Sequence, residues 1–170
     1  MGVIPRTRAL YDVSEAMDAA VKIDDIVDEL EWRVEERPAF IVLDSGRVGS
    51  VDRELLHLAE ELEDDEEPDI PEWQMPEYEF AREIVFGRFM RLPDQRELDE
   101  WSMMEDFAQT VPNARLRTEL LDALQGRGAF GNFKRAARRN RLDKAWHAYR
   151  RDALRRWAIQ WCERSGIPWK

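Results

Sequence analysis

Residues 116–166 have the sequence LRTELLDALQGRGAFGNFKRAARRNRLDKAWHAYRRDALRRWAIQWCERSG, which carries the clearest information on fold class. Leucines recur at helical spacing from Leu116 to Leu124, and Gly126 and Gly128 then interrupt the pattern. Glycine disfavours a helix interior, so the two glycines separate one helix from the next. The stretch predicts three consecutive helices joined by tight breaks.

The third of these helices has the strongest pattern. Apolar side chains recur at steps of three or four, which places them on one helical face. They are Leu142, Trp146, Tyr149, Ala153, Trp157 and Trp161. We expect the helix to begin near Leu142 or Asp143. It should end at Ser165-Gly166, because glycine supplies a left-handed cap and Pro168 prevents continuation.

The preceding sequence predicts a β-hairpin among further helices. Ala39–Leu43 and Arg47–Val51 flank the turn residues Asp44-Ser45-Gly46, and two strands alone are marginal, so the hairpin must pack on helices. Further helices are expected over Lys22–Trp32, Arg53–Leu62, Glu77–Leu92, and from a cap at Asp94 to Pro112.

These elements predict a mainly α, multi-helix single domain with a small N-terminal β-hairpin, or an α+β domain if the hairpin is counted. The expected parts form one compact unit. They are an N-terminal arm at 1–21, a helix, hairpin and helix at 22–62, an acidic linker at 63–75, and a helical part at 76–170. The arm fits either a helix or a flexible segment.

Large apolar residues supply the expected core. In the second helix of the basic stretch, Phe130, Phe133 and Ala137 form an apolar face. We also expect four tryptophans in the core rather than on a base-stacking surface. They are Trp32, Trp73, Trp101 and Trp146.

The net charge of −10 hides a division along the chain. Residues 114–170 hold 15 Lys and Arg against 5 Asp and Glu, a balance of +10. Residues 1–113 hold 11 against 31, a balance of −20, and nine of these acids lie in residues 60–72. Such asymmetry is typical of a nucleic-acid surface, of an acidic protein partner, or of one part of a molecule docking on another.

Composition disfavours membrane and secreted proteins. No apolar run approaches the roughly 20 residues of a spanning helix. The N-terminal residues lack the apolar core of a signal peptide. A single cysteine, Cys162, fits a reducing compartment, and we expect it to be a buried structural thiol. The expected location is the cytoplasm, with no membrane partner.

No catalytic, cofactor-binding or metal-binding constellation is recognisable, so the sequence favours a non-enzyme. Gly126–Gly131 match G-x-G-x-x-G, but a dinucleotide site places these glycines after a strand, and here helical spacing precedes them. The match therefore favours a plain helix break. His57 and His147 lack the partners and spacing of a zinc site. An enzyme of unknown type stays the minor alternative.

The cations of the basic stretch are the candidate contacts for an anionic partner: Lys134, Arg135, Arg138, Arg139, Lys144, Arg151 and Arg155. Three interpretations are open. The cations contact an acidic protein, which includes self-association, and the chain is a non-enzymatic interaction protein. They bind nucleic acid through the basic face of residues 127–156, with the helix–Gly-Arg-Gly–helix break as a helix-turn-helix. In the third interpretation, the cations meet the acidic residues Glu60–Glu67 within the fold.

The same stretch resembles a known family. The residues that carry the resemblance are Leu124-x-Gly126-x-Gly128-Ala129-Phe130-x-x-Phe133-Lys134, Trp146-x-x-Tyr149-Arg150, and Trp161-Cys162 with Gly166-Ile167. They are similar to bacterial proteins of Uncharacterised Protein Family 0158. Arg82-Glu83-Ile84 with Phe89, and the hairpin Phe40–Val48, extend the resemblance over roughly residues 22–167. It implies a bacterial cytoplasmic protein and supplies no catalytic residue.

Overall fold

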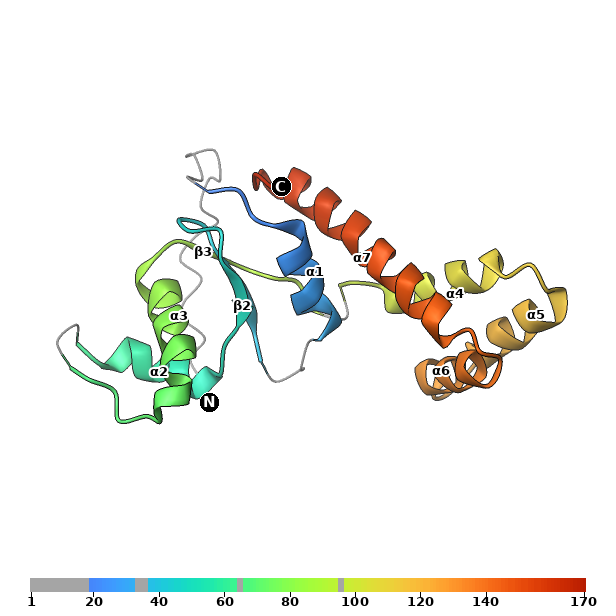
Figure 1. Cartoon of the computed structure of the whole chain (residues 1–170), viewed down its shortest axis with the longest axis horizontal. Coiled ribbons are helices and arrows are strands. Elements are labelled where there is room, and N and C mark those ends of the chain that lie inside the picture. The colour runs from blue at the N-terminus through green and yellow to red at the C-terminus, as the bar shows by residue number, and fades with distance from the viewer. Residues whose placement is uncertain (1–18, 33–36, 64–65, 95–96) are drawn as a thin grey trace.

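The computed structural model describes residues 19–32, 37–63, 66–94 and 97–170. These residues form seven α-helices and a small three-stranded antiparallel sheet, which confirms the mainly α fold class. The elements in chain order are α1 (Ile23–Glu31), β1 (Ala39–Val42), β2 (Val48–Ser50), α2 (Arg53–Glu61), the 3-10 turn η1 (Glu72–Gln74), α3 (Met75–Phe86), β3 (Phe89–Arg91), α4 (Glu100–Thr110), α5 (Ala114–Ala123), α6 (Ala129–Arg139) and α7 (Asp143–Ser165) (Figure 1). The expected arm lies almost wholly in residues 1–18, outside the described part.

The sheet lies between two layers of helices. Its strand order is β2-β1-β3, and β1 pairs antiparallel with both neighbours. Alternate β1 residues face opposite sides of the sheet. Ala39 and Ile41 pack with α1 and the C-terminal part of α7, whereas Phe40 and Val42 pack with α2 and α3. Both faces are therefore covered, which explains why all four β1 residues are buried.

The third strand corrects the prediction of a single helix over Glu77–Leu92. The helix ends at Phe86, and β3 then pairs with β1. At Gly87 the backbone leaves the helix, and a Cβ there would lie 2.5 Å from the carbonyl oxygen of Glu83. The strand is three residues long, too short for its own period-2 pattern to be recognised. Its position depends on the pairing with β1, which no local signal specifies.

The helices α4, α5 and α6 form a separate bundle with the first turns of α7. Its centre is aromatic: the Phe133 ring lies 5.1 Å from that of Trp146, and Phe107 lies 5.5 Å from the same tryptophan. Edge-to-face contacts of this kind contribute beyond the apolar area that they bury. Asp99, not Asp94, caps α4, because its side chain accepts a hydrogen bond from the backbone N–H of Ser102.

The long helix α7 joins the bundle to the sheet. It begins at Asp143 and ends at Ser165, and Gly166 has a φ of 67°, which confirms both predicted ends. Its buried side runs in steps of four residues: Trp146, Leu154, Ala158 and Cys162 are buried. In the second half of the predicted stripe, Trp157 and Trp161 stack on each other 6.0 Å apart and pack against the core, but they are only partly buried.

Several residues that we expected in the core are exposed. Trp32 and Trp73 are 82% and 76% exposed, and Trp101 and Phe130 are 37% and 44% exposed. Of the four predicted core tryptophans, only Trp146 is buried. Burial of these side chains was inferred from their apolar character alone, and the short helices of this chain do not have enough partners to cover them all.

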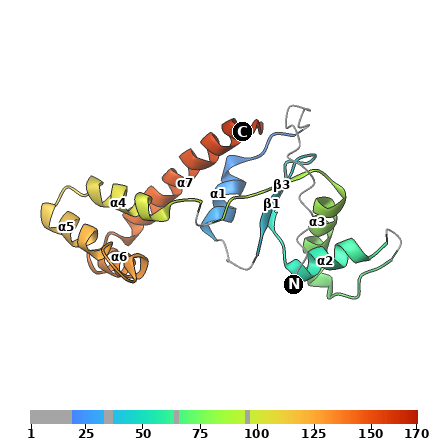
Figure 2. The same cartoon turned by 180° about the vertical axis from the view of Figure 1, so that it is seen from behind.

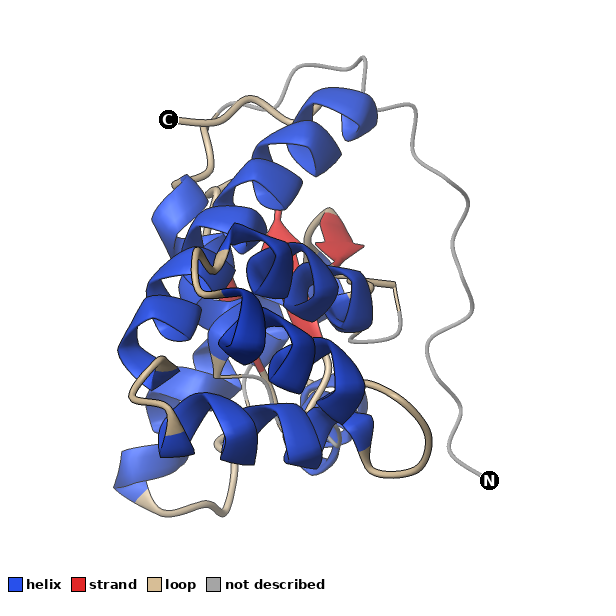
Figure 3. Cartoon of the chain, turned by 90° about the vertical axis from the view of Figure 1, so that its right-hand side faces the viewer, coloured by secondary structure: helices blue, strands red, loops and turns tan. Residues whose placement is uncertain are grey.

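The molecule is elongated, with α2 and α3 at one end and the bundle of α4, α5 and α6 at the other (Figures 1 and 2). Seen along this axis from the bundle end, helices lie in front of the small sheet (Figure 3). That residues 22–170 fold as one unit stays a prediction.

Candidate anion-binding surface

The local structure of α6 determines which of its cations face outward. Gly126 and Gly128 adopt left-handed φ values of 75° and 76°, which confirms the predicted helix break and starts α6 at Ala129. Phe133, Ala136 and Ala137 then face the bundle core. Residues between these positions must face away from the core, and Lys134, Arg135 and Arg138 are exposed.

Four of the seven predicted contact residues are exposed and have no carboxylate partner among the described residues, and we call them the cationic surface: Lys134, Arg135 and Arg138 on α6, and Lys144 at the start of α7. Lys134 and Arg138 are one helical turn apart, so their Cβ atoms are separated by about 5–6 Å. The Arg135 guanidinium donates to the side-chain oxygen of Asn132, an uncharged partner. No carboxylate of the described residues lies within ion-pairing distance of these four cations.

Arg139 is turned toward the protein instead. Its guanidinium and the side-chain amide of Asn140 both donate to the Glu119 carboxylate on α5, the amide at 3.1 Å. The hydrogen bond from Arg139, and after it the one from Asn140, lowers the pKa of Glu119. Arg139 therefore joins α6 to α5, and its charge is paired within the protein.

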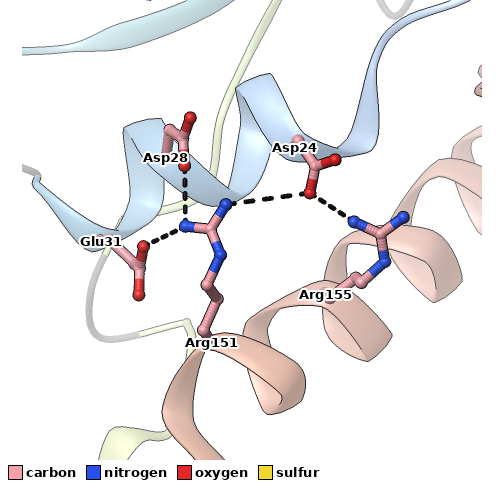
Figure 4. A network of polar contacts seen from close by, with 5 residues as sticks. All are labelled: Asp24, Asp28, Glu31, Arg151 and Arg155. Carbon is pink, nitrogen blue, oxygen red and sulfur yellow. Dashed lines mark hydrogen bonds and ion pairs between the residues drawn. The ribbon is translucent and has the colours of Figure 1, made fainter. Parts of the chain in front are cut away.

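Arg151 and Arg155 are also engaged by the protein's own carboxylates (Figure 4). Arg151 donates to Asp28, at 2.7 Å, and to Glu31, and it lies 3.8 Å from Asp24. Arg155 pairs with the same Asp24. The hydrogen bonds to Asp28 and then to Glu31 raise the pKa of Arg151 above its ordinary value. These contacts join α7 to α1.

Comparison with known proteins assigns the chain to a family. The model of the uncharacterised protein family UPF0158 matches residues 70–169, which is more than half of the chain. The chain belongs to UPF0158. No curated protein and no solved structure matches it.

The UPF0158 segment, residues 70–169, contains the cationic surface and the bundle beneath it. It also contains Glu119, the carboxylate that holds Arg139. The acidic partners of Arg151 and Arg155 lie on α1, outside the match. The predicted hairpin lies outside it as well, so the similarity established by the family model is shorter than the one inferred from the residues.

Among the described residues of the run Glu60–Glu67, none contacts the seven cations, and residues 64 and 65 of the run lie outside the described part. The internal carboxylates come from α1 and α5 instead. A signal for α1 was present in the sequence, because Asp24, Asp28 and Glu31 recur at steps of four and three and so share one helical face. This acidic stripe matches the one-turn spacing of Arg151 and Arg155.

The cysteine and the two histidines, the other candidate reactive or metal-binding residues, do not form a site among the described residues. Cys162 is fully buried as expected, and burial, with a smaller contribution from Glu163, raises its pKa to about 11. His57 lies 3.2 Å from Glu61 on the exposed side of α2, and His147 is exposed on α7. Within the described ranges, no three His, Cys, Asp or Glu side chains gather as metal ligands would. No described helix combines the length and apolarity needed to cross a bilayer.

Proposed function

We propose that the chain is a non-enzymatic interaction protein that binds an acidic protein segment through the cationic surface. One observation carries the proposal: Lys134, Arg135 and Arg138 on α6 and Lys144 on α7 are exposed and no described carboxylate pairs with them, whereas Arg139, Arg151 and Arg155 pair with carboxylates of α5 and α1. Like charges one helical turn apart destabilise a helix. A cluster of unpaired cations on a packed aromatic bundle is therefore better explained by an external anion than by the fold.

The chemistry of the surroundings favours a protein segment over a nucleic acid. The charges that flank the cationic surface are mixed, since Asp143 directly precedes Lys144 and Glu119 on α5 holds Arg139 beside Arg138. A duplex presents a long row of phosphates and would meet these carboxylates, whereas a short acidic segment needs only the four cations. The net charge of −10 repels any polyanion at long range, and the repulsion grows with the number of charges on the partner, so a short acidic segment is repelled less than a duplex.

Nucleic-acid binding is the second candidate, because the helix break before α6 is present and three of its cations face outward. Contacts to phosphates need no sequence code. With four cations, the logarithm of the binding constant should fall against that of the salt concentration with a slope of about −3 to −4.

Fluorescence anisotropy with the full chain tests the proposal, with a labelled oligo-glutamate peptide and a labelled short DNA duplex as probes. We expect peptide binding that Arg135→Glu with Arg138→Glu weakens by at least about tenfold, since like charges then face the peptide. The matched control is Arg91→Glu with Arg164→Glu, which makes the same charge change at two exposed positions outside the surface. Binding of the duplex and not of the peptide would replace the proposal with its alternative.

A further inference from the structure

A second charged surface lies at the opposite end of the molecule. Between the end of α2 and the start of α3, the exposed carboxylates of the described residues form what we call the acidic surface: Glu60, Glu61, Glu63, Glu66, Glu67, Asp69 and Glu72. His57 contacts two of them, at 3.2 Å and 4.0 Å. Within the described ranges no lysine or arginine is paired with any of the seven, and the Arg82 guanidinium of α3 donates to the backbone carbonyl of Leu62 between them, at 3.4 Å.

The two surfaces cannot meet within one chain. The acidic surface lies between α2 and α3, at one end of the molecule. The cationic surface lies on α6 and the start of α7, in the bundle at the other end (Figures 1 and 2). The 23 residues of α7 span about 34 Å, and the sheet stands between its C-terminal part and α2. Any pairing of the two surfaces must therefore involve two molecules.

We propose that the acidic surface of one copy binds the cationic surface of a second copy, so that the chains associate head to tail. This inference rests on the proposed function, because it names the acidic segment that the cationic surface binds. The second copy is inferred from complementarity of charge: one surface carries seven carboxylates that no described lysine or arginine pairs with, and the other carries four cations that no described carboxylate pairs with, at opposite ends of the same molecule.

Each surface also offers an exposed aromatic side chain among its charges. Trp73 follows Glu72 directly and is 76% exposed. Phe130 lies one helical turn before Lys134 and is 44% exposed. Large aromatic side chains are enriched in the buried centres of protein interfaces, where charged and polar residues form the rim. The exposure of these two rings, unexpected for a core residue, is accounted for if they become covered when the surfaces meet.

Head-to-tail contact has a specific consequence for assembly. The two surfaces differ, so the interface is heterologous, and a pair keeps one free surface of each kind, one on each molecule. Such an interface builds open chains or closed rings rather than stopping at a symmetric dimer. The contacts join exposed charges, which salt screens over a Debye length of about 8 Å near physiological ionic strength, so association should weaken as salt rises.

Sedimentation velocity of the full chain at increasing concentration and at low and high salt tests this inference. We expect reversible, concentration-dependent growth at low salt. Two variants should each stop it: Arg135→Glu with Arg138→Glu, which cancels the net charge of the cationic surface, and Glu67→Lys with Asp69→Lys, which leaves five carboxylates beside two lysines on the acidic one. A mixture of the two variants should form a dimer that grows no further, because one partner keeps only its acidic surface and the other only its cationic surface.

Controls separate this result from a change in folding and from failure of the proposed function. The variant Arg91→Glu with Arg164→Glu should associate like the unaltered chain, and all variants should keep its helical circular dichroism and melting temperature. A chain that stays monomeric at every concentration, or a mixture that forms no dimer, overturns the head-to-tail inference. If that monomer still binds oligo-glutamate, the proposed function stands without it; if it binds no acidic peptide, both fall.

Discussion

The ion pair between Arg150 and Glu100 offers the sharpest test of how α7 is held. Arg150 lies on the buried side of α7, midway between Trp146 and Leu154 in the run of four-residue steps. Its Nε donates to Glu100 at 3.0 Å, and one of its terminal nitrogens donates to the same oxygen. Glu100 is the first residue of α4, so the pair joins the two helices at the junction of bundle and sheet.

Burial determines the size of the effect. The side chains of Arg150 and Glu100 are 14% and 13% exposed. Breaking a fully buried ion pair costs about 3–5 kcal/mol, because an uncompensated charge is left behind, whereas exposed pairs contribute about 0–1 kcal/mol. Glu100 keeps some access to solvent and lies at a helix N-terminus, where the dipole stabilises a negative charge. We therefore expect Arg150→Met to destabilise the protein by about 2–3 kcal/mol.

Chemical and thermal unfolding of a double-mutant cycle measure this contribution. For a chain of this size, the expected loss lowers the melting temperature by about 5–10 °C. Glu100→Gln keeps an acceptor for the guanidinium and should cost about 1–2 kcal/mol. The double variant removes both charges, so we expect it to cost less than the sum of the single variants by at least about 1 kcal/mol.

The control is Arg156→Met, which removes an exposed arginine of the same helix whose guanidinium lies 6.0 Å from the ring of Tyr149. We expect it to change stability by less than about 0.5 kcal/mol. If Arg150→Met costs no more than this control, or if the costs of the two single variants simply add, the pair is not coupled and the reasoning from burial is wrong.

Three other measurements address the backbone, the thiol and the acid stability. Arg141 has a φ of 58°, so Arg141→Gly should stabilise the protein by about 1 kcal/mol in denaturant unfolding, and a loss of stability would refute the strain. Burial raises the pKa of Cys162 to about 11; a disulfide reagent at about pH 8 should therefore label the native chain orders of magnitude more slowly than the unfolded one, and immediate labelling would contradict this. The backbone N–H and guanidinium of Arg88 lower the pKa of Asp44, so its stabilisation is present above about pH 4 and is lost as the pH falls through the lowered pKa. Asp44→Asn should flatten the acid limb of a stability–pH curve, and an unchanged limb would exclude this carboxyl as its source.

Local signals explain what could be predicted from the sequence. The ends of α7 are specified by Gly166 and Pro168, and the β1–β2 turn by Asp44-Ser45-Gly46, and both were found in place. The third strand could not be predicted, because three residues carry no period and its stability depends on the pairing with β1. The exact buried side of α7 was missed for a similar reason, since it follows two different cores along one helix.

The candidate site divides in the same way. The outward direction of Lys134, Arg135 and Arg138 follows from the spacing of Phe133 and Ala137 and was predictable. The pairing of the other cations was not predictable from the sequence, because the partner of Arg139 lies 20 residues away along the chain and that of Arg155 lies 131 residues away. Pairing depends on which helices become neighbours, and that is a property of the tertiary fold.

One physical contrast runs through the basic stretch. Arg151 gains three carboxylate neighbours because α1 packs beside it, and the cations of the outward side of α6 gain none because no described element covers that side. A fold that needed these charges only for solubility would be equally served by charges of mixed sign, which avoid repulsion between neighbouring turns. Here the like charges are concentrated on a helix whose opposite face is fixed by the aromatic rings of Phe133 and Trp146. A rigid backing fixes the spacing of the Cα atoms that carry these cations, and this fixed spacing is the physical basis of the proposed acidic partner.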